Sequence, residues 1–93
     1  MVVIVQHRVQ DFEVWKPLFE EHQSVRQRHG AEGHAIYRAK DEPNLVTILM
    51  RYPSVEAAKG FAADPSLKEA MERGGVEGIP TVSMWDETEM RQY

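Results

Sequence analysis

Residues 11–30 constrain the fold most strongly, because they have the pattern of one long amphipathic helix. A spacing of about 100° per residue collects the large apolar side chains in one arc. That arc also contains two histidines and an arginine; its members are Phe12, Val14, Trp15, Leu18, Phe19, His22, Val25, Arg26 and His29. His22 points to where a core leucine is expected, so the pattern indicates a pocket beneath this helix.

Local signals define the two ends of this helix. Asp11 is a suitable N-cap, because its carboxylate can accept a backbone N–H of the first turn. Gly30 suits the position just after the helix. Pro17 lies inside and removes one backbone hydrogen bond, so we expect a kink there or a helix that becomes regular only after Trp15.

The remaining chain alternates between β-branched stretches and helical patterns, separated by turn and capping residues. The predicted elements are a strand at 2–9, the helix at 11–30, strands at 33–40 and 45–52, a helix at 55–63 that restarts after Asp64-Pro65 and ends at Gly74-Gly75, and a strand at 81–86. This βαββαβ order predicts a single α+β domain over residues 1–93 with a ferredoxin-like fold. Its four-stranded antiparallel sheet would have both helices on one face.

The strands carry more apolar residues than one face of that sheet can hold. These residues form two sets that cannot all lie on one face of the sheet. The first set is Val2, Ile4, Val46, Ile48, Met50, Val82 and Met84, and the second is Val3, Val5, Ile36, Leu45 and Leu49. Helices cover only one side, so a second cover is needed. We therefore predict a homodimer in which two sheets pack face to face.

Composition argues against several partners. The net charge is −4 and no basic run occurs, so nucleic-acid binding is not expected. The apolar start is too short for a membrane span or signal peptide, and the expected location is the cytoplasm. No cysteine is present. His22 and His29 lie roughly 10 Å apart along a helix, too far to share a metal, so no metal site is predicted.

Residues 7–16 (HRVQDFEVWK), then Phe19, Glu21-His22, Arg26 and Gly30, and later residues 53–58 (PSVEAA), carry a resemblance. They resemble the small dimeric α+β barrel proteins, in particular the branch grouped with antibiotic-biosynthesis monooxygenases and polyketide cyclases. The resemblance implies a cavity between the sheet and the helices of each subunit. It also implies cofactor-free oxygenation of polycyclic phenols and anthrones, aldol-type cyclisation, or lactone isomerisation. The Asn-His-Trp set of the haem-degrading branch is missing, and no cofactor is expected.

Two histidines are the candidate catalytic residues. His22 could act as general base or acid, with His7 from the first strand as its partner. Each also has a structural alternative: His22 could be satisfied by a carbonyl or carboxylate, and His7 could mark an exposed strand end. Candidate ligand-binding residues are Trp15, Phe19, Arg26, Tyr37 and Trp85.

These ligand-binding candidates have alternatives as well. Trp15 could be an aromatic wall or simply a core side chain, and Arg26 could bind a carboxylate or enolate oxygen or form a salt bridge at the rim. Two hypotheses for function follow. The first is a monooxygenase-like or cyclase-like enzyme acting on a small aromatic or polyketide-type substrate. The alternative is a non-catalytic dimer for small-ligand binding or assembly, which predicts a closed core beneath Trp15 and His22.

Overall fold

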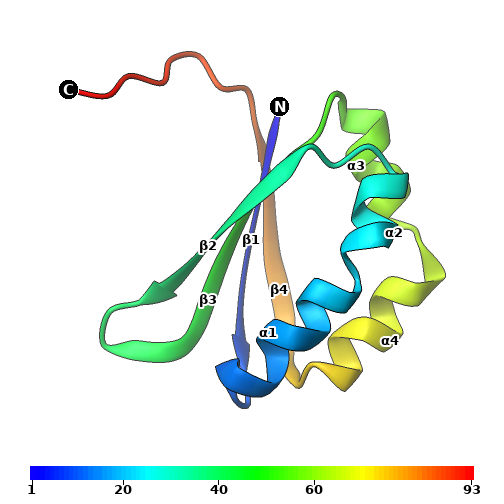
Figure 1. Cartoon of the computed structure of the whole chain (residues 1–93), viewed down its shortest axis with the longest axis vertical. Coiled ribbons are helices and arrows are strands. Elements are labelled where there is room, and N and C mark those ends of the chain that lie inside the picture. Colours follow the sequence, from blue (N-terminus) through cyan, green and yellow to red (C-terminus); the bar gives the residue numbers. More distant parts are fainter.

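The computed structural model describes residues 1–93 as one four-stranded antiparallel sheet covered by helices on one face (Figure 1). The sheet order is β2-β3-β1-β4. The elements are β1 (Val2–Val9), α1 (Phe12–Glu21), α2 (Gln23–Arg28), β2 (Gly33–Ala39), β3 (Glu42–Arg51), α3 (Val55–Ala62), α4 (Pro65–Arg73) and β4 (Val76–Trp85). The predicted ferredoxin-like α+β fold is confirmed. None of the helices α1 to α4 has the length and hydropathy that a membrane span requires.

The helix starts follow the capping signals of the sequence. The carboxylate of Asp11 accepts the N–H of Glu13 at 2.9 Å and begins α1. Ser54 caps α3 in the same way. Asp64 caps α4, which has proline at its first position, where the missing N–H removes no helical bond.

The predicted helix at 11–30 is interrupted at His22 rather than at Pro17. His22 has φ −84° and ψ 2°, and it ends α1 and begins α2. Its N–H is shared between the carbonyl oxygens of Leu18, at 3.3 Å, and Phe19, at 3.2 Å. Pro17 lies inside α1, which continues past it for four residues. The helix is already regular before Trp15, and the break at 22 places His22 at the junction of two helices.

The last strand is longer than predicted, since β4 starts at Val76 instead of residue 81. Gly78 and Pro80 are turn-forming residues in sequence, but here they lie within the strand. A register shift on β1 between Gln6 and Arg8 accommodates the additional residues of β4. Gly78 has φ +70°, a conformation in which glycine avoids the strain of a side chain.

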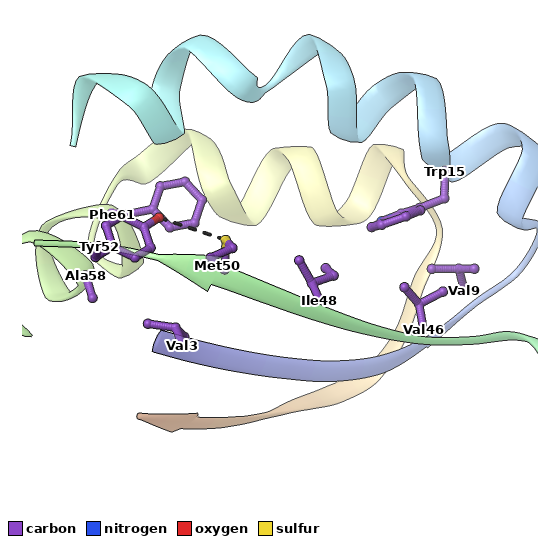
Figure 2. Packing of buried hydrophobic residues seen from close by; sticks show 9 residues of the cluster. All are labelled: Val3, Val9, Trp15, Val46, Ile48, Met50, Tyr52, Ala58 and Phe61. Carbon is purple, nitrogen blue, oxygen red and sulfur yellow. Dashed lines mark hydrogen bonds between the residues drawn. The ribbon is translucent and has the colours of Figure 1, made fainter. Parts of the chain in front are cut away.

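The strand register decides which residues face the helices. Val3 pairs with Met50 and Met84, and Val5 pairs with Ile48 and Val82. Directly paired residues share a face, so the sets proposed from sequence are corrected: Val3 and Val5 belong with the apolar residues of β3 and β4. The buried core contains Val3, Val9, Trp15, Val46, Ile48, Met50, Tyr52, Ala58 and Phe61 (Figure 2).

The face of the sheet away from the helices is also partly apolar. Ile4, Leu45 and Leu49 are half-buried there, and Trp85 is 57% exposed. No element of the chain covers this face, and residues 86–93 extend away from the body (Figure 1). A second apolar face is thus present, as the sequence argument requires.

Candidate functional site

A cavity of about 310 Å³ lies between the sheet and the helices. Of its 21 lining residues, 17 are hydrophobic, and the others are His7, His22, Arg26 and Pro80. Val82 and Met84, on the helix-facing side of edge strand β4, line it while remaining exposed. The cavity therefore opens beside β4, and few polar groups reach it.

Aromatic side chains of α1 form one wall of the cavity. Trp15 is 4% exposed and its ring centroid lies 4.9 Å from that of Phe19. Both residues line the cavity, so Trp15 belongs to the core and to the cavity wall at once. Gly74 makes room for Trp15, because a Cβ there would lie 3.0 Å from Cδ1 of the indole.

His7 lies on β1 beside this wall. Its ring packs edge-on against Trp15, with centroids 5.9 Å apart, and its Nδ1 has no hydrogen-bond partner. Burial lowers the pKa of His7, so its imidazole is neutral at neutral pH. The alternative in which His7 marks a solvent-exposed strand end is therefore wrong, because His7 is buried and lines the cavity.

His22 is held by a hydrogen-bonded chain that begins at the N-terminus of α4. Its Nε2 lies 2.9 Å from Oγ of Ser66, and the Ser66 hydroxyl donates to Oδ1 of Asp64 at 2.6 Å. The serine oxygen therefore accepts a hydrogen bond from Nε2–H, which leaves Nδ1 of His22 as the unprotonated ring nitrogen. Hydrogen bonds from Ser66 and His29 hold the pKa of Asp64 well below its usual range, so it stays ionised.

The protonation of His22 follows from its surroundings. Burial, followed by the nearby charge of Arg26, lowers the pKa of His22, and Asp64 opposes this effect only in part. His22 is therefore a neutral imidazole at neutral pH. No hydrogen bond or ring contact joins it to His7: the ring of His22 lies against Phe61, with centroids 5.8 Å apart. The two histidines line one cavity without forming a pair.

Arg26 follows His22 by one helical turn and is almost completely buried, with 3% exposure. Its guanidinium carbon lies 3.6 Å from the centre of the Phe19 ring, and its Nη2 has no hydrogen-bond partner. Burial lowers the pKa of Arg26 to about 10, which leaves it charged at neutral pH. The salt bridge at the rim, considered from sequence, is not formed.

Tyr37 and Trp85 lie on the face of the sheet away from the helices and do not line the cavity. Tyr37 is adjacent to Ile36, which pairs with the helix-facing Ile48, so the alternation of the strand turns Tyr37 outward. Trp85 is turned outward in the same way beside Met84. Their predicted place in the cavity is corrected by this register.

Strand alternation alone did not settle whether Tyr52 faces the helices, and sequence reasoning missed the Asp64–Ser66 link to His22. Burial raises the pKa of Tyr52 to about 12, so its hydroxyl stays protonated within the cavity lining. Asp64 and Ser66 follow a capping pattern in sequence, and nothing in that pattern indicates a contact with a histidine 44 positions earlier in the chain. No group of three or more His, Cys, Asp or Glu residues is arranged to hold a metal ion.

The fold and cavity define a ferredoxin-like α+β domain with a ligand-sized space between sheet and helices, and comparisons with known proteins agree on the fold. No protein-family model and no curated protein sequence matches the chain. A proposed antibiotic biosynthesis monooxygenase from Bordetella bronchiseptica is similar with a TM-score of 0.81 and 16% identity, over 95% of this chain and 96% of the other. A proposed antibiotic biosynthesis monooxygenase from Caulobacter crescentus has a TM-score of 0.75 and 20% identity, over 95% and 89%.

A third similar structure is SnoaB from Streptomyces nogalater, a cofactor-independent oxygenase. Its TM-score is 0.73 at 13% identity, over 94% of this chain and 93% of SnoaB. At such identities the similarity establishes the fold and leaves the chemistry to the site. The resemblance to the dimeric α+β barrel proteins is confirmed at the level of the fold.

Proposed function

We propose that the chain is a cofactor-independent monooxygenase-like or cyclase-like enzyme that takes a small aromatic or polyketide-type substrate into the cavity. The observation that carries the proposal is the state of His22. It is a neutral imidazole beside an apolar cavity, and its Nε2 proton is engaged by Ser66. A general base needs such a free lone pair close to the proton that it removes.

In the proposed first step, Nδ1 of His22 accepts a proton from a phenolic O–H or an activated C–H of the substrate. The charge that develops on the substrate is stabilised by Arg26, one helical turn away, in a poorly solvated cavity. Trp15 and Phe19 hold the substrate ring. The resulting anion then reacts with dioxygen in an oxygenase, or with a carbonyl of the same molecule in a cyclase.

His7 has a separate role in this proposal. It lies beside Trp15 with an unpartnered Nδ1, whereas His22 lies beside Phe61. It is therefore suited to hydrogen-bonding a polar atom of the substrate away from His22. The similar fold of SnoaB, a cofactor-independent oxygenase, supports the choice of reaction class.

We also propose that the uncovered apolar face of the sheet forms a homodimer. Ile4, Leu45 and Leu49 would be covered in it, together with the exposed Tyr37 and Trp85. Sedimentation velocity checks this directly: a monomer at all concentrations would contradict the dimer. The cytoplasmic location stays a prediction of the sequence.

The catalytic proposal is tested by oxygen uptake and product analysis with anthrone and its ring-carboxylated derivatives. We expect His22→Gln to lower kcat by about 100-fold or more, because the proton acceptor is lost. Arg91→Gln is the control, since Arg91 lies in the exposed tail and does not line this cavity. Full turnover by His22→Ala would refute the role of His22 and favour the alternative, a non-catalytic ligand-binding dimer.

A further inference from the structure

We propose that the cavity binds an apolar, ring-bearing carboxylic acid whose carboxylate pairs with the guanidinium of Arg26. The inference deepens the proposed function and rests on it only in treating the cavity as the ligand site. It concerns binding and does not require that the ligand be turned over.

Arg26 carries a charge that the chain itself does not neutralise. Its side chain is 3% exposed, Nη2 is unpartnered, and Arg26 takes part in none of the ion pairs of the chain. Glu32 lies with Arg26 around a neighbouring polar hollow, yet the two form no ion pair. Buried charges in proteins are normally paired, because desolvation strongly disfavours an isolated ion. The free protein therefore lacks an anion at this position.

The missing anion is best supplied from the cavity. Arg26 lines it, and no aspartate or glutamate does. The two lining histidines are neutral at neutral pH, and the Tyr52 hydroxyl is protonated, so no negative group of the lining repels an incoming carboxylate. A planar guanidinium matches a carboxylate through paired N–H···O bonds, a geometry that a lysine does not provide.

The rest of the cavity indicates the body of the ligand. Phe19 joins the aromatic wall of the cavity to the charged group. Its ring packs against Trp15, and the guanidinium of Arg26 lies over the same ring. Trp15 and Phe61 stand at opposite ends of the core, with Ile48 between them (Figure 2). A volume of about 310 Å³ is at the small end of ligand pockets. Fused aromatic rings bearing one carboxylate therefore fit better than a long chain.

The experiment compares 2-naphthoate with 2-naphthamide, two probes of nearly equal shape that differ in charge. Binding to the full chain is measured by calorimetry at neutral pH in a buffer without carboxylates. We expect 2-naphthoate to bind more tightly by about tenfold or more, the difference made by one charge-assisted contact. Arg26→Gln should remove this preference while changing 2-naphthamide binding by less than about threefold.

Two further variants complete the test. Arg26→Lys keeps the charge but loses the planar fork, so it should bind 2-naphthoate less tightly than the wild type and more tightly than Arg26→Gln. It also provides the test if Arg26→Gln does not fold. Arg91→Gln is the matched control, because it removes one positive charge from the exposed tail. It should behave like the wild type.

The proposal is overturned if the wild type binds both probes equally, if 2-naphthoate does not bind, or if the preference survives in Arg26→Gln. These outcomes are separable from failure of the proposed function. Loss of turnover in His22→Gln with no carboxylate preference would leave the enzyme proposal standing and reject the acidic ligand. A carboxylate preference without turnover of any substrate would support the acidic ligand and reject the enzyme proposal.

Discussion

Replacing Arg26 by methionine should stabilise the ligand-free protein. Methionine keeps an unbranched apolar stem and removes a buried charge that has no ionic partner. Lowering the pKa of Arg26 from its ordinary value to about 10 corresponds to about 3 kcal/mol against the charged form. The contact over Phe19 contributes about 1 kcal/mol that the variant loses. The expected net gain is about 1–2 kcal/mol in the free energy of unfolding.

Urea unfolding followed by circular dichroism measures this difference, in a buffer without carboxylate anions that could bind the wild type. A gain of about 1 kcal/mol should also raise Tm by roughly 4–8 °C in a domain of this size. Arg91→Met is the control, with a change of less than about 0.5 kcal/mol at an exposed position. If Arg26→Met is less stable than the wild type by about 1 kcal/mol or more, the guanidinium is compensated within the free protein and the reasoning is refuted.

Three more outcomes are expected. Ser66→Ala removes the oxygen that holds Nε2 of His22, so ¹⁵N chemical shifts of that ring should change from one tautomer to a mixture; an unchanged spectrum would reject the hydrogen-bonded chain. Gly74→Ala places a Cβ 3.0 Å from Cδ1 of Trp15 and should lower the free energy of unfolding by about 1–3 kcal/mol, whereas a stable variant would show that the indole can move freely. As the pH falls, His7 of the unfolded chain is protonated near the ordinary histidine pKa, about 6.5, whereas His7 of the folded protein is protonated only at lower pH because burial lowers its pKa. Stability should therefore be constant just above that pH and decrease below it, and His7→Gln should flatten the decrease; equal slopes in both proteins would contradict this.

The sequence determined the type and order of the elements of this protein, and most of their ends, because these signals are local. Period-two and 3.6-residue patterns depend on near neighbours, and caps such as Asp11 and Ser54 act within three residues. The order of the elements then left few folds open, which is why the ferredoxin-like sheet could be predicted. The same arc pattern placed Trp15, His22 and Arg26 on the side of the helix that lines the cavity.

Only the tertiary structure decided which faces of the strands and helices contact one another. Alternation shows that Tyr37 and Ile36 face opposite ways, but the pairing of Ile36 with Ile48 decides which of them faces the helices. The link from His22 to Ser66 joins residues 44 positions apart, and no local pattern records it. Whether Arg26 has an ionic partner likewise depends on all the groups that the fold places around it. Such contacts depend on strand register and helix packing, which are set by the whole chain.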